Sequence, residues 1–315
     1  MELYSYKQFE LNEKVNEFDL FIAATGYETR ASFLAKKNIN ANKKIALAFK
    51  DNVNNSIRVK NDLFFKNNGF ELIEISGSDD LTIIQIIQYN ISLKLEDEYS
   101  ILIDYSSMTR VLYGAIIKFI NTISMGKRKL SIYFSYCVAK FTPLTEEESA
   151  TFNFYPIKNY CNLSLPQKPT ALIAGLGYEK KRVFGLREFF DAEALYIFYT
   201  GNNDYTNIVE EKNKEVLASV KVENTFQYQI NDLVYTKMLL QDLCETLIQN
   251  FRIIIAPCGP KPFTLLSFII ANNIPNIDVW RISAGDDDSF IIDRKPSGEV
   301  ITVELIYVDK LILPR

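Results

Sequence analysis

A ten-residue pattern that occurs twice constrains the fold of this chain more than any other feature. The first copy, FIAATGYETR, covers residues 21–30, and the second, IAGLGYEKKR, covers residues 173–182. Each copy is an apolar run with glycine at its end, followed by Tyr-Glu and a basic residue. An apolar run bounded by glycine predicts a buried strand, and the Glu-plus-basic segment predicts the first turn of a helix. We therefore expect two strand–turn–helix units in which a ligand can approach the backbone at the turn.

The two copies stay in register over a longer stretch of the chain. Gly26, Tyr27, Glu28 and Phe33 each have an identical residue 151 positions later, and the same offset places Arg110 opposite Lys261. Two unrelated α/β domains also show similar element spacing, so chance is the alternative explanation. Register that holds over several motifs favours an internal duplication.

Apolar runs alternate with helical patterns in both halves, and this alternation predicts mainly parallel sheets covered by helices. In the first half we expect strands at 18–25, 45–49, 70–75, 99–104 and 130–138, with helices at 28–37, 51–67, 81–95 and 106–125. In the second half we expect strands at 171–175, 194–199, 225–229, 251–256 and 278–282, with helices at 179–190, 205–220, 232–250 and 262–272. The prediction is an α/β protein of two tandem Rossmann-like domains with pseudo-twofold internal duplication.

The pattern lapses where prolines and acidic residues accumulate. We expect a first domain at 1–142, a connector at 143–168 with an edge strand near 151–155, and a second domain at 169–315. The connector carries three prolines and the Glu146-Glu147-Glu148 run. The end of the second domain, 289–308, is expected to form a β-hairpin around 295–298.

Composition excludes several functions. The chain contains no histidine, which removes His-dependent nucleophiles, imidazole acid–base catalysis and His-ligated zinc. A net charge of −4 gives no electrostatic basis for binding duplex nucleic acid. The four cysteines form no CxxC pair, no secretion signal is evident, and no apolar run reaches the ~20 residues of a membrane span. We expect a cytoplasmic protein without a membrane segment.

Ligands of open parallel sheets bind beyond the carboxyl ends of the strands, near the point where the strand order reverses. The loops after the first and fourth strands of each half are therefore the candidate site. Hydroxyls and helix N-terminal amides suit a phosphate or ribose, and Arg110 and Lys261 are expected to hold phosphates. The candidate ligand-binding residues are Thr25, Gly26, Tyr27, Glu28, Asp104, Ser106, Ser107 and Arg110, and Gly175, Gly177, Tyr178, Glu179, Cys258, Gly259 and Lys261.

Structural explanations compete with several of these assignments. Ser106 or Ser107 can cap the following helix while Arg110 is solvated, and Glu28 and Glu179 can complement a helix dipole instead of accepting from a ribose. No GxGxxG or P-loop motif is present, so we expect no nucleotide cofactor. The run 286–288 of three aspartates is expected to be a solvated turn, and we expect no metal site.

The fourth-strand loops resemble a known family. CRISPR-associated Rossmann-fold (CARF) ligand-sensing domains carry roughly Asp-x-Thr-x-Gly-x-Lys at this place. The segment from Asp104 to Arg110 keeps the acid and the base, with Ser106 in place of Thr and Met108 in place of Gly, while Gly259-Pro-Lys261 keeps the Gly-x-Lys end. Two such halves in one chain are similar to SAVED domains. The resemblance implies a cyclic oligonucleotide bound between the halves, an effector protein partner, and a role in bacterial antiviral defence or signalling.

Three functions remain open from the sequence. The first is a nucleotide-ligand sensor that acts through a partner. The second is a phosphodiesterase or nucleoside hydrolase that works without histidine and uses Asp104, Glu28 or Glu179 as acid–base groups. The third is a protein-interaction subunit of a larger assembly.

Overall fold

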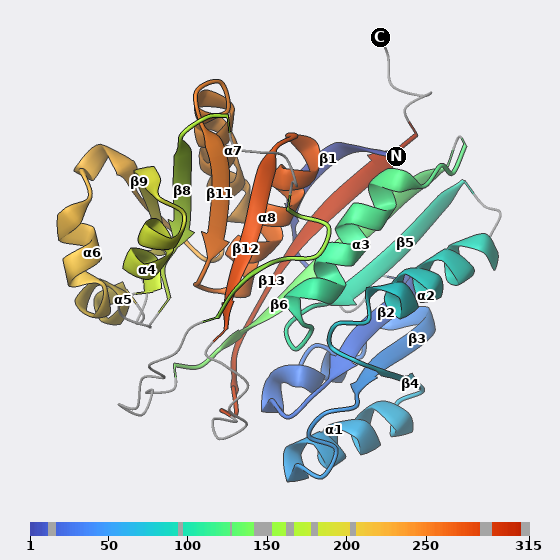
Figure 1. Cartoon of the computed structure of the whole chain (residues 1–315). Coiled ribbons are helices and arrows are strands. Elements are labelled where there is room, and N and C mark those ends of the chain that lie inside the picture. The colour runs from blue at the N-terminus through green and yellow to red at the C-terminus, as the bar shows by residue number, and fades with distance from the viewer. Residues whose placement is uncertain are drawn as a thin grey trace. The chain divides into compact units, whose positions relative to one another are not determined.

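The computed structural model describes residues 1–11, 17–93, 97–126, 128–141, 153–161, 167–177, 182–201, 206–283 and 292–309 (Figure 1). The chain divides into two compact units, Met1–Thr142 with Phe290–Arg315, and Pro143–Ser289. Each unit is built on a mainly parallel sheet flanked by helices, as the alternating sequence pattern predicts. Within the described ranges, no helix is long and apolar enough to cross a bilayer.

The first unit contains a seven-stranded sheet. Its order is β1 (Glu2–Phe9), β13 (Pro296–Val308), β6 (Lys129–Ala139), β5 (Glu98–Asp104), β2 (Glu17–Thr25), β3 (Asn40–Phe49) and β4 (Glu71–Ile75). The five strands from β6 to β4 are parallel. β13 pairs antiparallel with β6, and β1 pairs antiparallel with β13. The chain runs outward from β2 to β4 and then returns to the other side of β2 with β5. The strand order therefore reverses between β2 and β5, at the loops that were predicted to form the site.

Helices cover the first sheet through apolar faces. α1 (Ser56–Asn67) packs with η1 (Thr29–Ser32), and α2 (Asp80–Leu93) packs with α3 (Arg110–Thr122). Because crossovers between parallel strands are right-handed, the first pair covers one face of the sheet and the second pair the other. Phe65 of α1 packs with Phe21 and Phe70 in a core of buried aromatic side chains. The Asn55 side chain caps α1 by accepting from two backbone N–H groups of its first turn.

The second unit repeats this strand order in a six-stranded sheet. Its order is β10 (Thr225–Tyr228), β9 (Ala192–Thr200), β8 (Thr170–Gly175), β11 (Arg252–Pro257), β12 (Ile277–Ser283) and β7 (Asn153–Pro156). β10 to β12 are parallel, and β7 is the edge strand expected near 151–155, paired antiparallel with β12. Its helices are α4 (Arg182–Phe189), α5 (Thr206–Lys212), α6 (Lys214–Ser219), α7 (Leu233–Leu247) and α8 (Lys261–Asn273), with the short η3 (Val222–Asn224).

The C-terminal hairpin prediction is wrong, and the segment belongs to a different sheet from the one expected. The described part of 289–308 forms one long strand, β13, in the sheet of the first unit rather than in the second domain. Gly298, at φ +107°, lies where the pairing of β13 with β6 shifts register between Pro296 and Val300. The Pro-Ser-Gly segment at 296–298 therefore forms a bulge within β13 and does not reverse the chain.

Two further differences concern the first unit. The expected helix at 28–37 consists of two short 3-10 turns, η1 and η2 (Ala35–Lys37), so the described segment between β2 and β3 contains no α-helix. The strand β1 was not predicted. It lies at the sheet edge with only half-buried and exposed positions, and it lacks the continuous apolar run that marks the central strands.

Candidate functional site

The structure brings the loops after β2 and β5 together. A Cβ atom on Gly26 would lie 3.8 Å from the Cβ of Ser107, an ordinary van der Waals contact. The backbone of Gly26 also has no positive φ, so neither space nor conformation demands glycine here. The glycine signal correctly marks the end of the strand, and packing within the protein does not by itself require glycine at this position.

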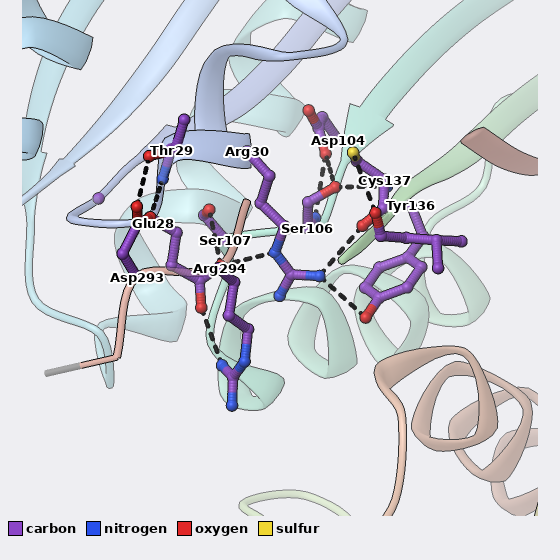
Figure 2. A network of polar contacts seen from close by, with 12 residues as sticks. Glu28, Thr29, Arg30, Asp104, Ser106, Ser107, Tyr136, Cys137, Asp293 and Arg294 are labelled. Carbon is purple, nitrogen blue, oxygen red and sulfur yellow. Dashed lines mark hydrogen bonds and ion pairs between the residues drawn. The ribbon is translucent and has the colours of Figure 1, made fainter. Parts of the chain in front are cut away.

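Glu28 lies between two guanidinium groups (Figure 2). Its Oε2 is 2.7 Å from Nε of Arg30, and its Oε1 is 2.9 Å from an Nη1 of Arg294. Glu28 is 6% exposed and Arg30 is 1% exposed. Glu28 precedes a 3-10 turn and makes no side-chain cap bond, so the helix-dipole explanation for this residue is wrong. Its carboxylate is instead the centre of a buried ion cluster.

Arg30 is held by side-chain and backbone groups of β6 as well as by Glu28. Its Nη1 donates to the hydroxyl of Tyr136 at 2.9 Å and to the carbonyl of Cys137 at 3.0 Å, and its guanidinium lies 5.1 Å from the Tyr136 ring centroid. Burial lowers the pKa of Arg30, but Tyr136 and Glu28 together raise it by more, so the pKa lies above its ordinary value. Arg30 therefore anchors the loop to β6 and is sealed from any ligand.

The residues just before β13 fasten the same loop from its other side. Both the backbone N–H and the hydroxyl of Thr29 donate to the Asp293 carboxylate at 2.7 Å, and the Arg30 N–H donates to the Arg294 carbonyl at 3.1 Å. Figure 2 shows Asp293 facing Thr29 and Arg294 facing Glu28. These partners are more than 260 positions apart in the sequence, and no local signal predicted them.

Ser106 and Asp104 form a closed buried contact. The backbone N–H of Ser106 donates to Asp104 Oδ1 at 3.0 Å and its hydroxyl donates to the same oxygen, while the N–H of Cys137 donates to Ser106 Oγ at 2.8 Å. Ser106 is 0% exposed, so it ties β5 to β6. Neither serine caps α3, whose N-cap is Thr109. Burial, and then Asp104, raise the pKa of the Cys137 thiol to about 12.

Thr25 has a structural role as well. Its hydroxyl donates to the Asp62 carboxylate, which also accepts from Nε of the buried Arg58 at 2.7 Å. Thr25 is 0% exposed. The hydroxyl therefore joins the end of β2 to α1 rather than facing the solvent side of the loop.

Three of the predicted residues in the first unit remain partly accessible: Tyr27, Ser107 and Arg110. Arg110 is the first residue of α3, which begins four residues after the start predicted for the helix at 106–125. Ser107 Oγ lies 3.5 Å from Oε2 of Glu28. Burial, and then Glu28, raise the Tyr27 pKa, while Arg294 and Arg30 lower it, so the Tyr27 phenol lies within electrostatic range of this cluster. Arg294, with a side chain 49% exposed, was not predicted and adds a second guanidinium.

In the second unit, glycine is required by close packing. A Cβ on Gly175 would lie 2.6 Å from the Phe263 ring, and a Cβ on Gly259 would lie 2.3 Å from the carbonyl oxygen of Leu176. The N–H of Cys258 donates to the Gly175 carbonyl at 2.9 Å, which closes the two loops on each other. Lys261 is half-buried at the first position of α8, where it was expected. Tyr178, Glu179 and the aspartates at 286–288 lie outside the described residues.

An asparagine holds the first loop in each unit. Asn61 Nδ2 donates to the Gly26 carbonyl at 2.9 Å, and Asn213 Nδ2 donates to the Gly177 carbonyl at 2.9 Å. Asn61 lies in α1 and Asn213 between α5 and α6, after the second strand of each unit. The same contact at glycines 151 positions apart supports the duplication inferred from sequence. The expected single helix at 205–220 is divided at Asn213.

The accessible groups of the first site are mainly cationic and polar. Guanidinium, hydroxyl and phenol groups are accessible around a locked carboxylate, and in the described part of the chain no group of three or more acidic or thiol side chains is placed to hold a metal. No protein-family model matches the chain, and no curated protein matches it.

Proposed function

We propose that the first unit binds a phosphate-bearing nucleotide at the carboxyl ends of β2 and β5, and that the protein is a nucleotide-ligand sensor. The observation that supports this most is the division of the site into a rigid base and an accessible rim. The base is the buried Glu28–Arg30 ion pair. The rim consists of Tyr27, Ser107, Arg110 and Arg294.

The rim matches the groups of a nucleotide. Guanidinium groups pair with phosphate oxygens, the Ser107 hydroxyl suits a phosphate or ribose oxygen, and Tyr27 offers an aromatic face to a base. Arg110 adds its charge at the N-terminus of a 13-residue helix, where the backbone also favours anions. In the second unit Lys261 holds the corresponding position at the start of α8.

The carboxylates favour binding over hydrolysis. Both oxygens of Glu28 are occupied by arginines, and Asp104 is 2% exposed with Oδ1 accepting two bonds from Ser106. A general acid or base must reach the proton that it transfers. The two candidates in the described residues are held away from a substrate, so a sensor fits the geometry better than a hydrolase.

The ligand class and the output follow from the family resemblance. The Asp104-to-Arg110 and Gly259-to-Lys261 segments suggest a cyclic oligonucleotide, and we propose an effector protein as the partner, in a bacterial defence or signalling system. A rigid base beneath the rim reduces the ordering cost of binding, which suits a receptor.

Isothermal titration calorimetry with cyclic oligonucleotides of several ring sizes tests the proposal. Arg110→Ala should weaken binding about tenfold or more, because a charged hydrogen bond to phosphate is worth about 1.5–3 kcal/mol. The matched control is Lys129→Ala, since Lys129 begins β6 at the amino ends of the parallel strands, whereas the site lies at their carboxyl ends. Chromatography of the same mixtures should show unchanged ligand. Binding unaffected by Arg110→Ala, or steady turnover of the ligand, would contradict the proposal.

A further inference from the structure

The second unit contains a cavity that none of the predicted site residues lines. Its volume is about 360 Å³, and its walls are Gly201, Gln227, Tyr228, Gln229, Asp232 and Tyr235. These residues come from the carboxyl ends of β9 and β10 and from the start of α7. The volume falls at the lower end of the roughly 300–1,000 Å³ that small-molecule sites occupy.

The floor of the cavity is a fixed backbone surface. The N–H of Gly201 donates to the Tyr228 carbonyl at 2.7 Å, so the two chain segments remain bonded just beyond the end of β9. Tyr228 is 2% exposed, and its ring stacks on Phe263 at 5.7 Å. A Cβ on Gly201 would lie 2.4 Å from Cγ and Cδ of Gln227, so the glycine makes room for the Gln227 side chain. The base of the cavity is therefore preformed.

The rim carries polar groups on one side and an aromatic ring on the other. The Asp232 Oδ1 accepts from the Tyr235 N–H at 3.0 Å as the cap of α7, which orients the carboxylate. Gln227 and Gln229 contribute amides that both donate and accept. Tyr235 is 48% exposed and offers its ring to a ligand. Among the described residues, the lining contains a carboxylate and no lysine or arginine, so its charge disfavours phosphate.

We infer that this cavity binds an uncharged nucleoside: a sugar whose adjacent hydroxyls donate to Asp232, joined to a flat base that packs on Tyr235. A carboxylate accepts from hydroxyl groups, amides read the edge of a heterocycle, and an aromatic ring covers its face. A 5′-phosphate would be repelled by Asp232. The cavity and the proposed nucleotide site share no residue, and the ligands proposed for them differ in charge. Loss of binding at one site therefore does not imply loss at the other.

Titration of the intact chain with the common ribonucleosides and their 5′-monophosphates, followed by saturation-transfer NMR and calorimetry, tests this assignment. At least one nucleoside should bind saturably and more tightly than its monophosphate. Asp232→Asn, which keeps a capping oxygen, and Tyr235→Ala should each weaken that binding about tenfold, as expected for the loss of a charged hydrogen bond or a stacking face. Tyr155→Ala is the matched control, because Tyr155 is an exposed tyrosine of the same unit, on β7.

The melting temperature of each variant establishes that it is folded before binding is compared. Gly201→Ala gives a second route, because its methyl group displaces the Gln227 side chain without removing a polar group. Gly201→Ala should also reduce the affinity for the nucleoside. Absence of saturable binding by every nucleoside at millimolar concentration, or equal affinity in the wild type and in Asp232→Asn, would overturn the inference, as would a preference for the monophosphates.

Discussion

The guanidinium Nε of Arg30 lies 2.7 Å from the Glu28 carboxylate, and both side chains are almost fully buried at the end of β2. Removal of one member of a buried ion pair leaves the other desolvated and uncompensated. Arg30→Leu should therefore lower the free energy of unfolding by about 3 kcal/mol. Urea denaturation followed by circular dichroism measures this change.

The control for Arg30 is Arg294→Ala, at the second arginine on Glu28. Its side chain is 49% exposed, so solvent screens the pair, and the change should stay below about 1 kcal/mol. The emission of Trp280, the single tryptophan of the chain, reports whether the second unit stays folded. Equal effects of the two substitutions would contradict the buried-pair interpretation.

The two asparagines that hold the glycine loops should behave alike. Asn61→Ala removes the side-chain donor to the carbonyls of Gly26 and Glu28, and Asn213→Ala removes the side-chain donor to the carbonyl of Gly177. Loss of a buried hydrogen-bond partner costs about 1–3 kcal/mol, and we expect each variant to be destabilised within that range. Thermal unfolding of both variants measures it. Destabilisation by only one of the two variants would show that the two asparagines do not have equivalent roles.

Alanine should be tolerated at one glycine of the strand-end loops and not at another. A Cβ on Gly259 would lie 2.3 Å from a backbone oxygen, which cannot rotate away, whereas a Cβ on Gly26 would make an ordinary contact. Gly259→Ala should destabilise the second unit by about 1–3 kcal/mol, the usual cost of overpacking, and Gly26→Ala should be close to neutral. Denaturation monitored through Trp280 for the first variant and circular dichroism for both separates the cases. A neutral Gly259→Ala would show that the loops can separate freely.

The Cys137 thiol should be unreactive in the folded protein. Its pKa of about 12, against an ordinary value of 9.0, keeps it protonated at about pH 8, and the thiolate is the reactive form. Because the folded pKa is raised, the stabilisation by this group is complete below pH 9.0 and is lost as the pH rises toward 12. Alkylation with iodoacetamide, mapped by mass spectrometry, should modify the half-buried Cys258 long before Cys137. Rapid modification of Cys137 in native protein would be inconsistent with this environment.

The sequence predicted the elements whose signals are local and strong. The central strands are continuous apolar runs, and a helix follows β5 and β11 as predicted, although α3 begins at Arg110 and not at 106. Contacts between distant segments left no such signal. The pairing of Asp293 with Thr29, and the entry of β13 into the first sheet, depend on residues that are close only after folding.

Burial explains why several candidate residues proved structural. Thr25 and Ser106 have hydroxyls that suit a ligand, but both are 0% exposed and bonded within the protein. Polar residues at strand ends can face either inward or outward, and composition alone does not distinguish the two. Arg30 stood inside the repeated pattern, two residues after Glu28, and this spacing was the one available clue to the ion pair.

The binding proposal is tested most directly by one calorimetric comparison. Wild type and the Arg110→Ala, Arg294→Ala double variant are titrated with the cyclic oligonucleotide that the wild type binds best. We expect saturable binding by the wild type and none by the double variant, with nearly unchanged melting temperatures, since Arg110 lies at the start of α3 and the Arg294 side chain is 49% exposed. Equal affinity in the two proteins, or no binding by the wild type, would contradict the proposal.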